Sequence, residues 1–168
     1  TDEQRLNDLN AAIADPRIDA VWCLRGGYGM TRILDQVDFA PLRKRPKAII
    51  GFSDITALLN AAQVEAGLVT FHAPMARAPL TPFSRWHFDR VLTTVNPAGR
   101  LGRVAPPADV LVPTSGRIVT LVPGQATGPL VGGNLTLLQC LIGTRYFPDF
   151  SGTLLFIEDV GEDLYSVD

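Results

Sequence analysis

Lys47-Ala48-Ile49-Ile50-Gly51-Phe52-Ser53-Asp54 changes character halfway along its length. After Lys47, its first half is apolar, which is typical of a buried parallel strand. Apolar residues then follow at the spacing of a helix face, at Ile55, Leu58 and Leu59. The stretch therefore predicts a strand, a tight turn at Ser53 and then a helix. Such a turn exposes the serine hydroxyl and directs N–H groups of the helix start towards the same place.

The alternation of strand and helix recurs along the chain. Helices are predicted over residues 4–14, 30–37, 55–62 and 85–95, and strands over residues 18–24, 48–52, 68–71 and 153–157. Gly132-Gly133-Asn134 is predicted to open a further helix, over residues 135–142. This order favours an α/β fold with a parallel sheet and right-handed crossovers.

A change in composition after residue 96 predicts a domain boundary. Residues 97–129 are rich in proline and contain short β-branched runs such as residues 117–121. We expect an N-terminal parallel-sheet α/β domain over 1–96, a crossing segment over 97–130, and part of a smaller, β-rich C-terminal domain over 131–168. The chain begins inside a predicted helix and ends without a helix stop signal, so we expect it to be truncated at both ends.

Composition and charge narrow the class of protein. The 168 residues are 46% hydrophobic and 19% charged, which is enough for a globular core. The net charge is −2 without a basic cluster, so we expect no nucleic-acid or membrane partner. No apolar run approaches the roughly 18 residues of a membrane span. Cys23 and Cys140 lie in apolar runs and are predicted to be buried, reduced thiols.

Two turns are candidate parts of a site. The loop Arg25-Gly26-Gly27-Tyr28-Gly29 follows a predicted strand, and its glycines allow the backbone to approach a bound group. It is either a tight turn, an N–H donor to an oxyanion, or a docking loop for a peptide. Its glycine spacing is not the dinucleotide-binding fingerprint, and it lacks the lysine of a phosphate loop. Ser53 is either a helix cap or a nucleophile, and a nucleophile requires a base and an orienting acid.

Acidic and imidazole side chains complete the candidates. Glu158 ends a predicted buried strand, where it could orient a histidine or simply face solvent. The two histidines are His72, after a predicted strand, and His87, on a predicted exposed helix. Either fits a loop or core histidine as well as a functional one. No spacing of Cys, His and acidic residues matches a zinc site, so no metal is expected.

Five ordered motifs together resemble the LD-carboxypeptidase family of serine peptidases, which includes the microcin-immunity peptidases. They are Arg-Gly-Gly-Tyr-Gly from Arg25, Gly-Phe-Ser-Asp-Ile-Thr from Gly51, Thr-Phe-His-Ala-Pro-Met from Thr70, Gly-Gly-Asn-Leu from Gly132 and Phe-Ile-Glu-Asp-Val-Gly-Glu from Phe156. The resemblance covers nearly the whole chain. It implies a bacterial cytoplasmic enzyme without metal or cofactor that releases the terminal D-alanine from murein tetrapeptides during cell-wall recycling.

The resemblance also implies roles for individual residues. It makes Ser53 the nucleophile and Glu158 the acid of a Ser-His-Glu triad, and it places the triad histidine beyond Glu158 in the C-terminal part. It assigns the oxyanion hole to the N–H groups of Gly26 and Asp54. Candidate substrate contacts are Arg25, Gly27, His72 and Asn134, with Arg25 suited to a terminal carboxylate. Family members are often dimers, so a homodimer is a candidate assembly.

Three other functions stay open from the sequence. The first is a microcin-immunity-type peptidase that cleaves an aminoacyl-nucleotide amide. The second is a non-catalytic module that binds muropeptides. The third is a nucleotide-binding α/β domain, which would rest on Gly26, Gly27 and Gly29 alone.

Overall fold

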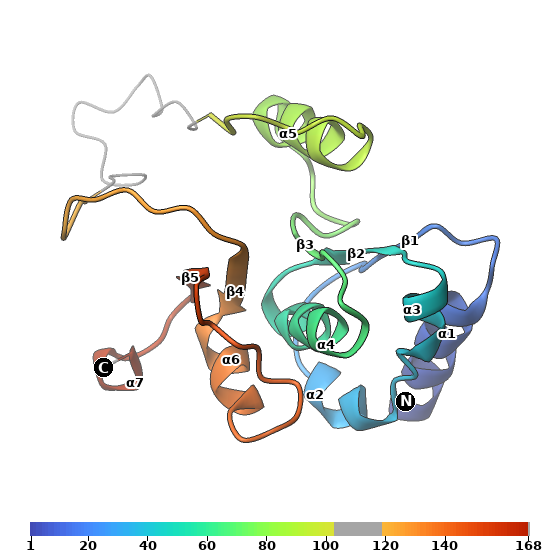
Figure 1. The fold of residues 1–168 in the computed structure, drawn as a ribbon. Helices are drawn as coiled ribbons and strands as arrows, with labels where there is room; N and C mark the ends of the chain where they lie inside the picture. Colours follow the sequence, from blue (N-terminus) through green and yellow to red (C-terminus); the bar gives the residue numbers. More distant parts are fainter. Residues whose placement is uncertain (103–118, 168) are drawn as a thin grey trace. The chain divides into compact units, whose positions relative to one another are not determined.

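The computed structural model describes residues 1–102 and 119–167 (Figure 1). The chain divides into two compact units: Thr1–Ala78 with Thr127–Asp168, and Pro79–Ala126. The first two residues of the predicted β-branched run 117–121 lie outside the described residues, and its last three form no strand. The domain boundaries at residues 96 and 130 therefore stay predictions.

The first unit contains a three-stranded parallel sheet in the order β1-β2-β3 (Figure 1). The strands are β1 (Ala20–Trp22), β2 (Ala48–Gly51) and β3 (Phe71–His72). Ala20 pairs with Ala48, and Gly51 at the end of β2 pairs with His72. This parallel arrangement confirms the predicted α/β class, and it brings the carboxyl ends of β2 and β3 to one edge.

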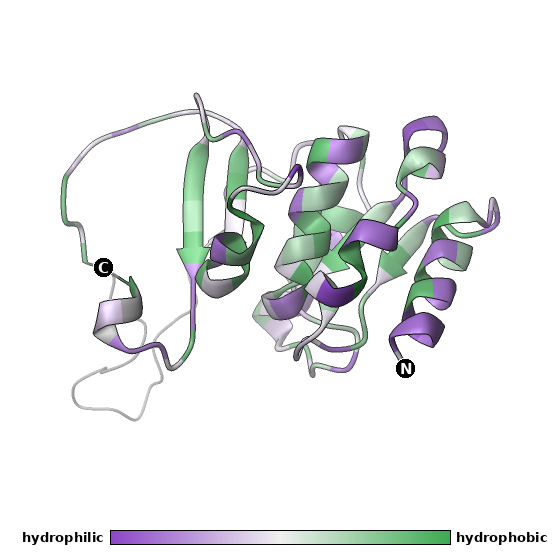
Figure 2. Ribbon diagram, turned by 90° about the horizontal axis from the view of Figure 1, so that it is seen from below, coloured by the Kyte–Doolittle hydropathy of each residue, from purple (hydrophilic) through white to green (hydrophobic). Residues whose placement is uncertain are grey.

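The first helix of this unit, α1 (Asp2–Ala14), starts at a capping box between Thr1 and Gln4. Its apolar residues recur at helical spacing, so that Leu6 and Leu9 pack against the core and Ile13 is buried. Hydrophilic and hydrophobic colours alternate along it in Figure 2. The predicted helix over 30–37 is split into α2 (Met30–Ile33) and a 3-10 turn, Leu34–Gln36; the short helix α3 (Ala40–Lys44) was not predicted.

Helix α4 (Thr56–Ala66) is the centre of the first unit. Every residue from Thr56 to Ala62 is buried, because the helix contacts β2 and β3 as well as β4 and α6 of the C-terminal part. A helix covered on several sides is apolar around much of its circumference, in agreement with its sequence. It ends at Gly67, whose φ of 67° lies in the left-handed region that favours glycine.

The C-terminal part of the first unit forms a second, two-stranded parallel sheet. The elements of this C-terminal part are β4 (Leu130–Asn134), α6 (Leu135–Leu141), β5 (Leu154–Glu158) and α7 (Leu164–Val167), and the sheet is formed by β4 and β5. The helix over 135–142 and the strand over 153–157 are confirmed within one residue at each end. Asn134 pairs with Glu158, so both strands deliver a polar residue to the same edge.

Helix α6 begins directly after Gly132-Gly133-Asn134, as predicted, but the sequence did not indicate that both glycines belong to strand β4. Glycine is rare in strand interiors, so the pattern indicated a turn. Here it is required by close packing: a Cβ on Gly132 would collide with the carbonyl of Phe156 in β5. The Nδ2 of Asn60 in α4 also donates to the Gly132 carbonyl over 3.0 Å, which ties β4 to α4.

Two further predictions need correction. The strand over 68–71 is displaced to Phe71–His72, because Leu68 is buried in the core of the connection and Val69 is 79% exposed. Cys140 is exposed rather than buried, whereas Cys23 is partly buried, and both thiols are free. Burial, with a smaller contribution from the charge of Asp54, raises the pKa of the Cys23 thiol to about 11.

The second unit contains α5 (Pro82–Leu92), which starts three residues before the predicted position and ends three before it. It starts there because the Thr81 side chain caps it and Pro82 occupies its first turn. His87 is partly buried between Phe83 and Trp86 rather than exposed. Among the described helices, none combines the length and the apolar character needed to cross a membrane.

Candidate active site

Ser53 lies on the turn between β2 and α4, as the sequence predicted. Phe52 is extended, with φ −153° and ψ −171°, and the chain then reverses sharply into the 3-10 turn Ser53–Ile55. Ser53 has a φ of 58°, the one positive φ at a non-glycine residue among those that the structure describes. A side chain in this left-handed conformation costs about 1–2 kcal/mol, and such strain is typical of functional turns.

The turn does not use Ser53 as a helix cap. Phe52 occupies the cap position of the 3-10 turn and Ile55 that of α4, and neither makes a side-chain capping bond. The Ser53 side chain is partly exposed. A strand, a residue in a strained conformation and a helix start follow one another here, which is the local geometry of a nucleophile elbow.

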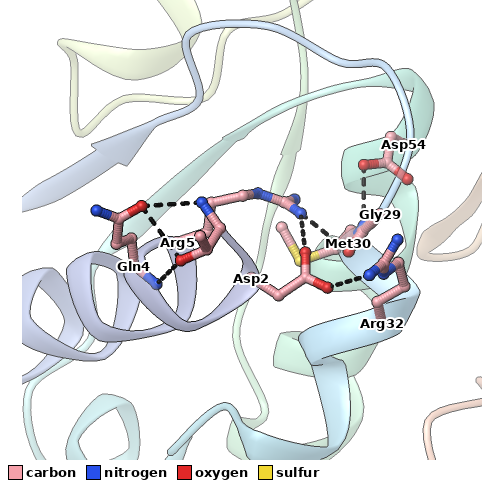
Figure 3. Close-up of polar contacts among 8 residues, drawn as sticks. Asp2, Gln4, Arg5, Gly29, Met30, Arg32 and Asp54 are labelled. Carbon is pink, nitrogen blue, oxygen red and sulfur yellow. Dashed lines mark hydrogen bonds and ion pairs between the residues drawn. The ribbon is translucent and has the colours of Figure 1, made fainter.

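The glycine loop lies directly against Ser53. A Cβ added to Gly26 would be 3.1 Å from the Ser53 Cβ and 3.2 Å from its Oγ, so only glycine leaves this space free. The loop is joined to the serine turn by the buried side chain of Asp54, which accepts a hydrogen bond of 3.0 Å from the Met30 N–H (Figure 3). Two segments that are distant in sequence thus meet around one hydroxyl.

Arg25 and Gly27 occupy the open side of this loop. Both are exposed, and a Cβ on Gly27 would be 3.0 Å from the Arg25 Nη1, so the guanidinium lies close to the loop backbone. An exposed guanidinium next to free backbone can receive a carboxylate. Tyr28, also in this loop, is 81% exposed.

Glu158 and His72 lie close together at the ends of β5 and β3. The Glu158 Oε1 is 4.0 Å from the His72 Nε2, which is too long for a hydrogen bond. Burial lowers the pKa of His72, so its imidazole is neutral at pH 7 and the two form no ion pair there. Aromatic rings surround the imidazole, with Phe156 centred 5.0 Å and Phe52 5.9 Å away.

The electrostatics of Glu158 differ from those of its neighbour. Burial, followed by the nearby charge of Asp159, raises the pKa of Glu158, and a hydrogen bond with Asn134 only partly opposes this. Its Oε1 is buried without a hydrogen-bond partner among the described residues, as is the Nδ1 of His72. A buried carboxylate oxygen that lacks a donor is suited to accept one from another group.

Asn134 has a structural role that the sequence did not indicate. Its Oδ1 caps α6 by accepting from the Leu137 N–H over 3.1 Å, and its Nδ2 donates to Asp159 over 3.2 Å. Although burial opposes it, hydrogen bonds from Val160, Thr136 and Asn134 hold the pKa of Asp159 below its usual value. Asn134 and Asp159 therefore form a fixed polar support next to Glu158.

A pocket of about 270 Å³ adjoins this edge. Its lining contains Leu135, Ile157, Glu158, Asp159, Gly161 and Glu162. No group of three or more Cys, His, Asp or Glu side chains within residues 1–102 and 119–167 could hold a metal ion.

Sequence reasoning named these residues as candidates but did not predict all the contacts that the structure shows between them. The structure brings Gly26 and Asp54 to Ser53, and His72 to Glu158. The bond from Met30 to the Asp54 carboxylate spans 24 residues, and no local pattern announces it. One signal in the sequence could have placed His72. It follows a predicted parallel strand, and the register of that strand with β2 brings His72 beside Gly51, at the edge where β2 ends.

Comparison with known proteins gives the family. The LD-carboxypeptidase N-terminal domain matches residues 1–73, and the LD-carboxypeptidase C-terminal domain matches residues 127–168. A murein tetrapeptide carboxypeptidase of Pseudomonas aeruginosa is 38% identical over 178 residues, which cover the whole of this chain and 54% of that protein. The chain spans about half the length of the curated relatives it matches.

Solved structures agree with these matches. A muramoyltetrapeptide carboxypeptidase from Oxalobacter formigenes is 34% identical with a TM-score of 0.76, over 99% of this chain and 53% of that one. An MccF-like protein from Bacillus anthracis is 29% identical with the same TM-score of 0.76, over 94% of this chain and 51% of that one. The two matching domains, these relatives and the shared α/β architecture confirm the resemblance: the chain belongs to the LD-carboxypeptidase family.

Proposed function

We propose that the whole protein is a serine LD-carboxypeptidase that hydrolyses the L,D-amide bond and releases the terminal D-alanine of murein tetrapeptides in cell-wall recycling. The observation that carries the proposal is the strained Ser53 turn with Gly26 against its hydroxyl. The names of the Pseudomonas and Oxalobacter relatives support the substrate class. A cytoplasmic location and a homodimer remain predictions from the family resemblance.

In the proposed mechanism the Ser53 Oγ attacks the amide carbonyl as a triad histidine removes its proton. The histidine that the family carries after the glutamate takes this role, and His72 is not assigned to it. The imidazolium then protonates the amine of D-alanine as the C–N bond breaks. A water molecule, deprotonated by the same histidine, then attacks the acyl-enzyme ester, and the Ser53 Oγ leaves with the proton that the histidine returns. Glu158 orients the imidazole and stabilises its positive charge.

The oxyanion of the tetrahedral intermediate would accept hydrogen bonds from the N–H groups of Gly26 and Asp54. Each such donor contributes about 3 kcal/mol to the stabilisation of the transition state. The unpartnered Oε1 of Glu158 supports the triad assignment, because an imidazole N–H would satisfy it. Arg25, Gly27, His72 and Asn134 remain proposed substrate contacts, with Arg25 facing the terminal carboxylate.

Substitution of Ser53 tests the proposal in the full-length protein. Ser53→Ala should reduce D-alanine release from a murein tetrapeptide to the background level, whereas the exposed Ser151→Ala should leave it unchanged. Ser53→Gly should be equally inactive, yet about 1 kcal/mol more stable than Ser53→Ala, because glycine relieves the strain at a φ of 58°. Unreduced release by Ser53→Ala would refute the assignment.

A second function is favoured by the similarity to a microcin C7 self immunity protein, MccF, solved in complex with aspartyl sulfamoyl adenosine, which is 26% identical with a TM-score of 0.70. It is hydrolysis of an aminoacyl-nucleotide amide by the same serine. Parallel assays with a murein tetrapeptide and an aminoacyl sulfamoyl nucleoside would separate the two. Binding of the tetrapeptide without turnover by the full-length protein would instead favour a non-catalytic muropeptide-binding module.

A further inference from the structure

The peptide group between Gly29 and Met30, at the end of the glycine loop, is hydrogen-bonded to a side chain through its carbonyl and to another through its N–H. The Gly29 carbonyl accepts a hydrogen bond of 3.2 Å from the Nη1 of Arg5 in α1, and the Met30 N–H donates over 3.0 Å to the Asp54 Oδ2 (Figure 3). These two polar groups belong to the same planar peptide and point in opposite directions. A guanidinium and a carboxylate thus grip one peptide dipole from its two ends, in the orientation that both charges favour.

The peptide lies at the junction of the glycine loop and α2, where the Gly29 carbonyl also accepts a backbone hydrogen bond of 3.3 Å from the Arg32 N–H. Gly29 has a φ of 117°, a conformation that glycine adopts readily and from which it can also readily depart. The Arg5 guanidinium packs against this residue so closely that a Cβ there would be 2.8 Å from the Nη1. Rotation of the Gly29–Met30 peptide would break the bonds to Arg5 and Asp54 as well as that from the Arg32 N–H, and it would leave the buried Asp54 side chain without this donor.

Arg5 is itself oriented by a second residue of α1. Asp2 contacts the Arg5 Nη1 over 3.3 Å with Oδ1 and the Nη2 of Arg32 over 2.6 Å with Oδ2 (Figure 3). The start of α1 is therefore connected to the glycine loop by charge-assisted hydrogen bonds. These contacts hold the far side of the loop, and Asp54 holds the side that faces Ser53.

We propose that Arg5 and Asp54 are positioning residues that clamp the Gly29–Met30 peptide and thereby hold the Gly26 N–H at the oxyanion site. This inference rests on the proposed function. Asp54 would act twice: its backbone N–H is one oxyanion donor, and its carboxylate fixes the loop that supplies the other. Arg5 would act from α1, in which Asp2 orients its guanidinium.

Arg5→Met tests the clamp in the full-length protein, because methionine keeps the length of the stem but removes the donor. Hydrogen exchange at the Met30 amide should become about tenfold faster, since the loop opens more often. The kcat should fall about 10-fold to 100-fold with an unchanged KM, because the oxyanion donor matters in the transition state. Arg5→Lys should restore part of both values, because an ammonium group can still donate to the carbonyl.

Two further variants make the result specific. Arg17→Met is the matched control, because it removes an exposed arginine that pairs with Asp15 and does not contact the loop. Asp54→Asn keeps an oxygen that can accept from Met30 but loses the charge, so it should move both readouts in the direction of Arg5→Met. Equal effects of Arg17→Met and Arg5→Met would overturn the role of Arg5.

The two readouts separate the clamp from the proposed function. Unchanged exchange at Met30 in Arg5→Met would overturn the clamp, whatever the activity. Faster exchange with an unchanged kcat would overturn its role in catalysis. If the unsubstituted protein releases no D-alanine, the proposed function has failed, and the exchange measurement alone then decides whether the clamp exists.

Discussion

Replacing Gly26 with alanine should impair catalysis without unfolding the protein. The new Cβ would lie 3.1 Å from the Ser53 Cβ, 3.2 Å from its Oγ and 3.4 Å from the Met75 Cε. Ordinary van der Waals contact begins at about 3.4 Å, so the loop and Ser53 must separate by about 0.3 Å. The φ of Gly26 is not in the positive range, so alanine adds no backbone strain there.

This displacement sets the size of the expected effect. A misplacement of about 1 Å at a reacting group can cost about 100-fold, so about 0.3 Å costs about fourfold. Complete loss of the Gly26 donor would raise the cost to about 100-fold or more. We therefore expect the kcat for D-alanine release to be reduced by a factor between about fourfold and about 100-fold, while the thermal unfolding temperature changes by no more than a few degrees.

The control is Gly124→Ala, at a glycine with nothing within 4 Å of the added Cβ and no positive φ. The assay is D-alanine release from murein tetrapeptide by full-length variants, with kcat and KM determined separately. A kcat of Gly26→Ala within twofold of that of Gly124→Ala would show that the glycine loop does not supply an oxyanion donor. If the amount of folded Gly26→Ala protein falls by the same factor as its activity, the loss of activity is caused by disturbed packing rather than by loss of the oxyanion donor.

Three other substitutions test the core and the proposed triad acid. Leu58→Ala, at a fully buried position of α4, should lower the free energy of unfolding by about 2–5 kcal/mol, whereas Val64→Ala on the exposed side should cost much less, as measured by urea denaturation. Asn60→Ala should cost about 1–3 kcal/mol in the same assay, because the buried Gly132 carbonyl loses its donor. Burial raises the folded-state pKa of Glu158, so the stability from its protonated form is full below the ordinary glutamate pKa and is lost as the pH rises through the raised value. Glu158→Gln should be inactive, because it removes the proposed triad acid. It should also unfold at a higher temperature than the unsubstituted protein at pH 7, and this difference should vanish near pH 4. The same difference at both pH values would contradict the pKa argument.

Much of the fold could be predicted because its signals are local. The apolar run before Ser53 and the helical spacing after it predict β2, the turn and α4, and all three are confirmed. The run before Glu158 likewise predicts β5. Periodicity and turn residues carry enough information for such elements, since each is stabilised by burial of one continuous segment.

The remaining features depend on contacts between distant segments. Strand β4 contains two glycines, and only its close packing against Phe156 explains why they are needed in a strand. Residues 68–71 are apolar except for Thr70, but pairing with β2 starts only at Phe71, because register is set by the partner strand. The bond between Met30 and Asp54 and the grip of Arg5 on Gly29 have no sequence pattern at all.

The discontinuity of the first unit has a consequence for how the family can vary. Its two parts, Thr1–Ala78 and Thr127–Asp168, are joined through Asn60 and Gly132, which are 72 positions apart, while Pro79–Ala126 forms a separate unit. The entropy of closing such an excursion grows only with the logarithm of its length, so doubling it costs about 0.6 kcal/mol. The intervening segment can thus become longer or shorter at a small cost in free energy, without a change in the contacts that hold the scaffold around Ser53.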